Sequence, residues 1–153
     1  MKPQLFSRTL FVDDRGHFEN ICLDYPYLNF TSKRAYICSN FEQGLVRAFH
    51  YHEKESKIFI CLKGAAKFVL FEGCKTSKDT IKNVPIIFTI SNSIGKAIFI
   101  PSNYANGWQS LTSDTVLLGL SNVTLEESRN DDYRFLPREI EGHHPNLWIT
   151  QWR

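Results

Sequence analysis

The chain has 153 residues, of which 42% are hydrophobic and 14% aromatic, including 12 Phe. This composition predicts one folded domain over residues 1–153 and excludes a disordered chain. The formal net charge of +2 lacks the basic excess of a dedicated nucleic-acid binder, so we expect no nucleic-acid partner. The sequence shows neither an apolar run of about 18 residues nor a cationic leader followed by an apolar segment, and we therefore expect a cytoplasmic protein with no membrane contact.

Short apolar segments separated by turn-forming residues recur along the first 120 residues. Strands are predicted at residues 10–12, 18–23, 34–38, 45–51, 58–62, 66–71, 86–90, 96–100 and 116–120. Lys63-Gly64 lies between two of these segments, 58–62 and 66–71, and predicts that they form a hairpin. No amphipathic helix of about 10 residues is evident before residue 125. The predicted fold class is all-β, an antiparallel β-sandwich or jelly roll.

The pattern changes near the C-terminus. Thr124-Leu125-Glu126-Glu127 matches a capping box, which predicts a short helical turn. The segment after it is irregular, and Trp148 and Trp152 predict that this tail packs against the rest of the domain. His143 and His144 stand in a loop with Gly and Pro, where we expect them at the surface.

One stretch combines several groups that can do chemistry. His50 and His52 are separated by one residue, and Lys57 follows after a charged turn. Residues i and i+2 of a strand point to the same face, so both imidazoles would enter one cavity if that face is internal. Two imidazoles and an ammonium could hold a metal, transfer protons or bind an anion. The alternative is a structural or solvent-exposed pair of histidines without chemical function.

The spacing of glycines, histidines and a proline around this stretch resembles the two motifs of the cupin superfamily. The matching residues are Gly44, His50, His52, Gly64, Gly95 and Pro101. Two positions that hold Glu and His in metal-binding cupins hold Lys57 and Asn106 here. An ammonium at a ligand position repels a cation. The resemblance therefore implies a cupin jelly roll that uses no metal and no other cofactor.

Four segments within residues 10–137 resemble, in the same order, the dTDP-4-dehydrorhamnose 3,5-epimerase family of cupins. They are Phe11-Val12-Asp13-Asp14-Arg15-Gly16-His17-Phe18, Val46-Arg47-Ala48-Phe49-His50-Tyr51, Lys57, and Ile100-Pro101-Ser102-Asn103-Tyr104-Ala105-Asn106-Gly107-Trp108. That family acts on nucleotide-linked 4-keto-6-deoxy sugars. The resemblance implies a metal-independent isomerase that epimerises C3, C5 or both by removing and returning a proton.

The resemblance also implies roles for individual residues. His50 would be the base, because an imidazole can take a proton next to a ketone near neutral pH. Lys57 would stabilise the enolate oxygen, and His52 would complete the catalytic set. The implied substrate-binding residues are Arg15, Phe18, Asn40, Arg47, Asn106 and Trp108.

Two of these roles make structural demands. Arg47, whose planar guanidinium suits a sugar or a diphosphate, would point away from His50 on a regular strand, so a shared pocket requires a bulge. In the family, the segment that holds Arg15 and Phe18 reaches into the neighbouring subunit's site, which implies a homodimer. The implied ligand is a nucleoside-diphosphate sugar, and the resemblance favours a dTDP-linked one.

The chain departs from the epimerases in several respects, and two of them concern the proton transfers. The family's second acid, a Tyr, falls at about Leu118, and the C-terminal segment whose Asp supports the base is absent. The nucleotide-sugar 3,4-ketoisomerases also lack this Tyr, and their R-G-F-H-x-H and C-L-N-G motifs resemble residues 47–52 and 61–64. In that alternative, His50 and His52 would move one proton between C3 and C4. We expect an epimerase, with a ketoisomerase and a non-catalytic sugar-binding cupin as alternatives.

Overall fold

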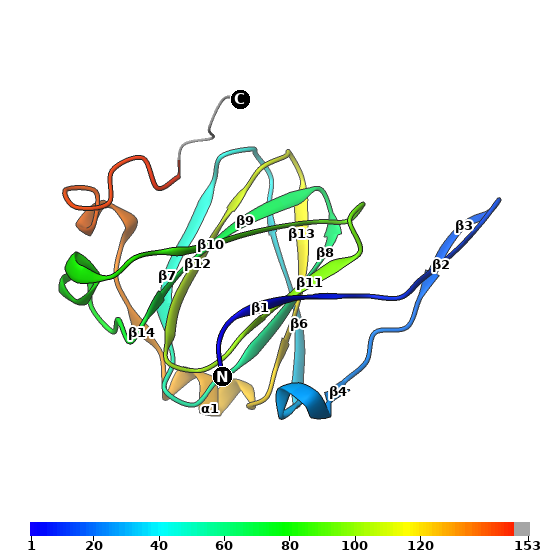
Figure 1. The fold of residues 1–153 in the computed structure, drawn as a ribbon, viewed down its shortest axis with the longest axis horizontal. Coiled ribbons are helices and arrows are strands. Elements are labelled where there is room, and N and C mark those ends of the chain that lie inside the picture. Colours follow the sequence, from blue (N-terminus) through cyan, green and yellow to red (C-terminus); the bar gives the residue numbers. More distant parts are fainter. Residues whose placement is uncertain (149–153) are drawn as a thin grey trace.

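A computed structural model describes residues 1–148 and shows two five-stranded antiparallel sheets packed as a β-sandwich (Figure 1). The first sheet has the order β1 (Gln4–Ser7), β11 (Lys96–Ile100), β8 (Lys57–Lys63), β13 (Thr115–Ser121), β6 (Arg34–Asn40). The second has the order β10 (Ile86–Ser91), β9 (Ala65–Glu72), β12 (Tyr104–Ser110), β7 (Val46–Tyr51), β14 (Tyr133–Arg134). The all-β prediction is confirmed.

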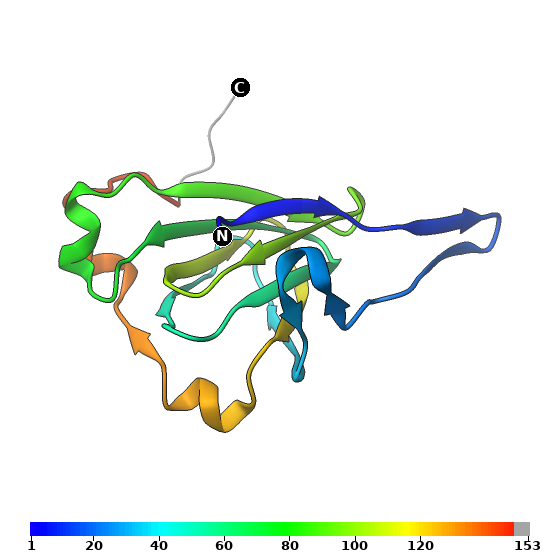
Figure 2. The same cartoon turned by 60° about the horizontal axis from the view of Figure 1, so that its bottom comes forward.

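The remaining elements are short and lie outside the two sheets. Two-stranded ribbons are formed by β2 (Leu10–Asp13) with β3 (Gly16–Glu19) and by β4 (Asp24–Tyr25) with β5 (Phe30–Thr31). The helical segments are η1 (Pro26–Leu28), η2 (Ser77–Lys82), α1 (Leu125–Arg129) and η3 (Pro137–Glu139). Within residues 1–148 no helix is long and apolar enough to cross a membrane. In Figure 2 the β2–β3 ribbon projects away from the sandwich to the right, and α1 lies at the bottom of the view.

The core lies between the two sheets. Phe59 and Ile98 of the first sheet meet Phe68, Leu70 and Trp108 of the second. Burying one such side chain contributes about 1.5–3 kcal/mol. The outer face of the first sheet is also covered, by the segment that carries β4, η1 and β5. Because β8 is buried on both faces, it reads as a continuous apolar run rather than an alternating one.

The predicted hairpin of residues 58–62 and 66–71 is wrong. The first segment lies in β8, which pairs with β11 and β13, whereas the second lies in β9, which pairs with β10 and β12. Lys63-Gly64 therefore carries the chain from one sheet to the other, with Gly64 at a φ of 77°. A turn inside a hairpin and a turn that leads from one sheet to the other have the same residue composition. Packing against distant strands decides which strands pair.

Strand boundaries also differ from the prediction. The strand expected at residues 18–23 ends at Glu19, and the chain continues as a connection to β4. The sequence analysis did not predict β12, whose Asn106, Gly107 and Gln109 are poor strand formers. All of β12 is nevertheless buried, because it occupies the centre of the second sheet.

The predicted capping box is confirmed at α1. The hydroxyl of Thr124 accepts a hydrogen bond from the backbone N–H of Glu127, and the Glu127 carboxylate accepts one from the backbone N–H of Thr124. The predicted packing of the tail is confirmed for Trp148, whose ring lies 5.7 Å from that of Phe49. Trp152 lies outside the described residues.

The two histidines expected at the surface are half-buried instead. His143 Nε2 lies 2.7 Å from the Thr80 hydroxyl, and His144 Nε2 donates a hydrogen bond of 2.7 Å to the Thr80 carbonyl. The His144 ring also packs on Phe71. The loop is polar in composition, but it folds back onto η2, which no local pattern indicates.

Candidate active site

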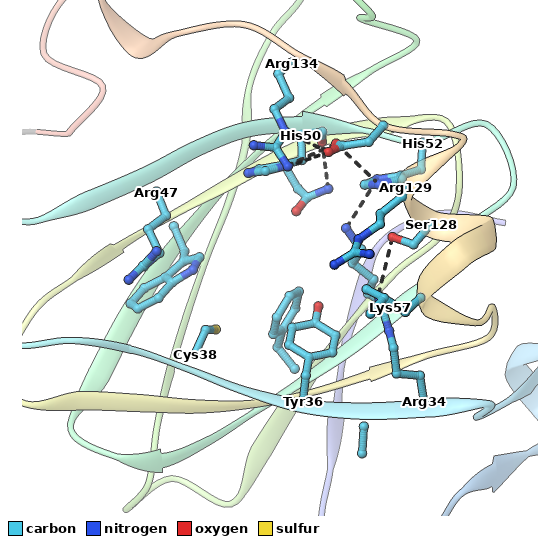
Figure 3. A pocket seen from close by; sticks show the side chains of 16 residues that line it. Arg34, Tyr36, Cys38, Arg47, His50, His52, Lys57, Ser128, Arg129 and Arg134 are labelled. Atoms are coloured by element: carbon cyan, nitrogen blue, oxygen red, sulfur yellow. Dashed lines mark hydrogen bonds and ion pairs between the residues drawn. The ribbon is translucent and has the colours of Figure 1, made fainter.

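A cavity of about 740 Å³ opens between the sheets (Figure 3). Its walls are formed by β6 and β8 of the first sheet, β7 and β12 of the second, and α1 with the segment that leads to β14. The structure brings together here six of the nine residues that the sequence analysis singled out. They are Arg47, His50, His52, Lys57, Asn106 and Trp108.

A bulge allows Arg47 and His50 to share the cavity. His50 pairs with Asn106 and Arg47 with Trp108, so β7 contains one more residue between these pairs than β12 does. The extra residue changes the face to which the strand directs its side chains. The bulge that the sequence analysis required is therefore present.

His50 is held by a carboxylate that the sequence analysis missed. Its Nδ1 lies 3.2 Å from Asp132 Oδ1, and Asp132 accepts a 2.7 Å hydrogen bond from Arg134 Nε. Burial raises the pKa of Asp132, but the hydrogen bonds from Arg134 and His50 outweigh it and keep the pKa below its usual value. Because an ionised carboxylate only accepts, Nδ1 donates and Nε2 is left to take a proton.

Burial also sets the protonation of His50. It lowers the pKa of the imidazole, and the hydrogen bond to Asp132 offsets part of this effect. The ring is therefore neutral at pH 7, as a base must be. The sequence analysis noted that the family's supporting Asp segment is absent and did not identify Asp132 in its place, because Asp132 is far from His50 in sequence and only the path of the chain after α1 brings it there.

Lys57 lies next to His52 at the closed end of the cavity. Lys57 Nζ is 3.3 Å from His52 Nδ1 and 3.6 Å from Glu55 Oε2. Burial lowers the pKa of Lys57, and the Glu55 carboxylate opposes this. Burial and the neighbouring Lys57 lower the pKa of His52 to about 4. The sequence analysis did not single out Glu55.

Cationic side chains surround the open part of the cavity. Arg47 donates through Nε to Asn40 Oδ1 at 2.8 Å and through Nη2 to the Ser39 carbonyl at 2.9 Å. Asn40 does not line the cavity itself; it holds Arg47 in place. The sequence analysis missed three further arginines of the wall, Arg34, Arg129 and Arg134.

Aromatic and amide groups complete the walls. Asn106 donates through Nδ2 to the His50 carbonyl at 3.0 Å, which ties β12 to β7 beside the base. Trp108 lies opposite Arg47 in the register of β12 and β7, and Tyr36 projects from the first sheet toward the cavity (Figure 3). The Tyr36 hydroxyl makes no hydrogen bond with any residue of 1–148, so it is available to a ligand. The sequence analysis also missed Tyr36.

Arg15 and Phe18 do not line the cavity of their own chain. Both lie on the projecting β2–β3 ribbon, where Arg15 pairs with Asp13. The Phe18 ring is 61% exposed. Their role in binding stays a prediction, since it requires a second subunit.

The donor set at the cavity does not fit a divalent metal. In the described part of the chain, no three His, Cys, Asp or Glu side chains are grouped as metal ligands. The ammonium of Lys57 lies within 3.6 Å of both His52 and Glu55, where it would repel a cation. Metal independence of the chemistry stays a prediction.

The sandwich, together with the motif histidines inside it, defines this protein as a cupin. The family model described as "FdtA: WxcM-like, C-terminal" matches residues 1–137. The chain therefore belongs to this family of cupins.

Known proteins with similar sequence or structure fit this assignment. The spore coat polysaccharide biosynthesis protein SpsL of Bacillus subtilis is 28% identical over 142 residues, which cover 92% of this chain and 91% of the relative. QdtA, a sugar 3,4-ketoisomerase from Thermoanaerobacterium thermosaccharolyticum solved with TDP, superposes with a TM-score of 0.70 at 23% identity, over 93% of this chain and 94% of QdtA. The dTDP-4-dehydrorhamnose 3,5-epimerase of Bacillus anthracis, solved with TDP and PPi, superposes with a TM-score of 0.76 at 20% identity, over 98% and 86%.

Proposed function

We propose that this protein is an isomerase of a nucleoside-diphosphate-linked 4-keto-6-deoxy sugar and that it begins by removing the proton at C3. One observation carries the proposal: the Asp132-supported His50 and the Lys57 ammonium line the same cavity. A base and a fixed cation are the two groups that enolisation of a ketone requires. The TDP ligands of QdtA and of the Bacillus anthracis epimerase support a nucleotide-linked substrate.

The first step uses groups whose protonation states the geometry defines. His50 Nε2 takes the C3 proton, the C–H electrons form the C3–C4 double bond, and the carbonyl electrons move to O4. Lys57 donates a hydrogen bond to the resulting enolate oxygen. A positioned donor of this kind contributes most when the site excludes water, and Lys57 is only 8% exposed.

The diphosphate has a matching surface in the arginines of the wall. Arg47 and Arg129 have guanidinium groups that can donate hydrogen bonds to phosphate oxygens, whereas Arg34 is held by Glu55 behind the cavity. Trp108 pairs with Arg47 across the two strands and would offer an apolar face to the sugar or the base. The ligand would therefore lie with its keto sugar toward Lys57 and its diphosphate toward the arginines.

Epimerisation at C3 is the outcome that Tyr36 favours. Epimerisation returns the proton to the face opposite the base. Tyr36 belongs to the first sheet and His50 to the second, so the two side chains approach the cavity from opposing walls. Burial raises the pKa of Tyr36, so it enters the reaction as a proton donor. Tyr36 would take the place of the family Tyr that is missing near Leu118.

Migration of the carbonyl from C4 to C3 is the second candidate. His50 could return the C3 proton to C4 on the same face, while the O3 hydroxyl loses its proton and O4 gains one, so that the carbonyl ends at C3. The extent of the match favours it: QdtA is covered over 94% of its length, the epimerase over 86%. The R-x-F-H-x-H pattern at residues 47–52 adds to this support.

Incubation with dTDP-4-keto-6-deoxyglucose in heavy water, followed by NMR of the sugar, tests the proposal. Deuterium at C3 with inversion supports the epimerase, and deuterium at C5 as well indicates double epimerisation. A carbonyl at C3 supports the ketoisomerase. The variant His50→Asn should lower turnover by about 10²–10⁴-fold, because the base is lost. Absence of exchange with dTDP-, GDP-, CDP- and UDP-linked keto sugars would refute the proposal and favour a sugar-binding cupin.

A further inference from the structure

The side chain of Glu55 is a buried carboxylate directly behind the cavity. It is 0% exposed and stands in the turn between β7 and β8. Its Oε1 accepts hydrogen bonds from Arg34 Nη2 at 2.8 Å and from the Ser121 hydroxyl at 2.6 Å. Its Oε2 accepts one from the Ser128 hydroxyl at 2.7 Å. Donors from β6, β13 and α1 therefore fix this carboxylate in one orientation.

The same carboxylate touches both catalytic candidates at the closed end of the cavity. Glu55 Oε2 lies 3.0 Å from His52 Nε2 and 3.6 Å from Lys57 Nζ. Lys57 Nζ in turn lies 3.3 Å from His52 Nδ1. An ammonium only donates, so His52 Nδ1 must be the acceptor, and the single proton of the neutral ring is on Nε2, facing Glu55.

We propose that Glu55 is a positioning residue that orders this pair: it keeps Lys57 charged and directed into the cavity, and it fixes His52 as the acceptor for Lys57. Both ring nitrogens of His52 then face protein groups. His52 is thus not available as a base, and proton abstraction is left to His50. The kinetic consequences rest on the proposed function, whereas the arrangement of protons does not.

The charges around Lys57 explain why Glu55 is needed. Lys57 interacts electrostatically with titratable or charged groups from four parts of the chain. They are Arg34 and Cys38 of β6, His50 of β7, His52 and Glu55 of the turn, and Asp132 before β14. Burial lowers the pKa of Lys57, and Glu55 is the largest of the effects that raise it. Without this negative charge, the buried ammonium would face Arg34 with only Asp132 to balance it.

Nuclear magnetic resonance of the free protein tests the arrangement without any substrate. In ¹⁵N spectra, His52 should carry its proton on Nε2 across pH 5–8. In Glu55→Gln, Lys57 should titrate about one pH unit or more below its wild-type value, because an opposite charge within about 4–6 Å is lost. Glu53→Gln is the matched control, since Glu53 lies on the same turn but pairs with Lys75 outside the cavity.

The pH dependence of kcat supplies a second readout. In Glu55→Gln, the alkaline limb of the kcat–pH profile should move to lower pH. Activity should recover on acidification, because Lys57 regains its proton. Glu55→Asp keeps the charge and should leave the alkaline limb within about 0.5 pH unit of wild type. This variant keeps the test informative where Glu55→Gln fails to fold.

Three results would overturn the inference: an unchanged Lys57 titration in Glu55→Gln, a His52 proton on Nδ1, or loss of the Lys57 charge in Glu55→Asp. A wild-type protein that turns over no nucleotide keto sugar would instead refute the proposed function. The resonance measurements on His52 and Lys57 would still decide the role of Glu55 in that case.

Discussion

At the scale of single residues, the pair formed by His50 and Asp132 determines the pH at which the site can work. The carboxylate raises the pKa of His50 against the effect of burial, and it directs Nε2 toward the cavity. His50 acts as a base only when neutral. Activity should therefore rise with pH through the lowered pKa of His50 and fall where Lys57 loses its proton.

Asp132→Asn tests this pair. Loss of the negative charge should lower the pKa of His50 further, so the acid limb of the pH–rate profile should move to lower pH. The plateau should fall about 10²-fold, because a weaker and less well oriented base remains. Steady-state kinetics from pH 4 to 9 would measure both effects.

An exposed carboxylate provides the comparison for that change. Asp114 pairs with Lys63 at the surface, and Asp114→Asn should have the same pH–rate profile as the wild type. A wild-type plateau and acid limb in Asp132→Asn would show that the base does not depend on this carboxylate.

The sequence predicted the residues of the site that lie in one continuous stretch. His50, His52 and Lys57 were found because strand alternation and motif spacing are local properties. Asp132 and Tyr36 were missed because the groups they face are distant in the chain; the strand pattern at residues 34–38 includes Tyr36 but does not indicate what its side chain faces. Glu55 was missed although it lies between His52 and Lys57, since a charged turn usually indicates solvent exposure.

At the scale of elements, the pairing of β6 with β13 positions Tyr36. Gly119 lies opposite Tyr36 in the register, and a Cβ at Gly119 would stand 2.4 Å from Tyr36 Cζ and 2.8 Å from its hydroxyl oxygen. A glycine is thus required for the ring to lie over β13. The edge of the same ring packs against Phe59 of β8.

Gly119→Ala should displace the Tyr36 ring and destabilise the protein by about 1–3 kcal/mol, the range for overpacking. Urea unfolding would measure the change. Gly142→Ala serves as control, because a Cβ there meets no atom within 4 Å. Combining Gly119→Ala with Tyr36→Ala should recover part of the loss, and full additivity of the two changes would contradict the steric explanation.

Element prediction succeeded where the local pattern and the final environment agree. The strands at 34–38 and 86–90 were found within a few residues of β6 and β10. The change of sheet at Gly64 and the buried β12 were not found, because strand partners are chosen by packing across the sandwich. The choice of partners is a property of the whole chain rather than of a window of residues.

At the scale of the whole molecule, the β2–β3 ribbon pairs with no other strand among residues 1–148. It projects from the sandwich in both views (Figures 1 and 2). Phe11, Val12 and Phe18 on it are 61%, 76% and 61% exposed. A lone two-stranded ribbon is marginally stable in water, and an apolar surface of this kind indicates an interface. A homodimer in which this ribbon reaches the neighbouring cavity is the expected assembly.

Phe11→Ser with Phe18→Ser should shift the protein from dimer to monomer, because apolar area is lost from the interface. Analytical ultracentrifugation would measure the change. Val84→Ser, at a position 84% exposed in the connection between η2 and β10, should leave the dimer intact. A monomeric wild type would contradict the predicted assembly.

Mixed dimers would then test whether the ribbon completes the neighbouring site. Arg15→Ala should impair binding and His50→Asn should lower turnover by about 10²–10⁴-fold when each forms a homodimer. If Arg15 acts in the partner's cavity, a mixed dimer of the two variants has one site with an intact His50 and an intact Arg15, so activity returns on mixing. If each chain uses its own Arg15, both sites of the mixed dimer carry a defect and mixing restores nothing. Because each chain carries one of the two changes in either case, recovery depends only on whether the ribbon crosses between subunits.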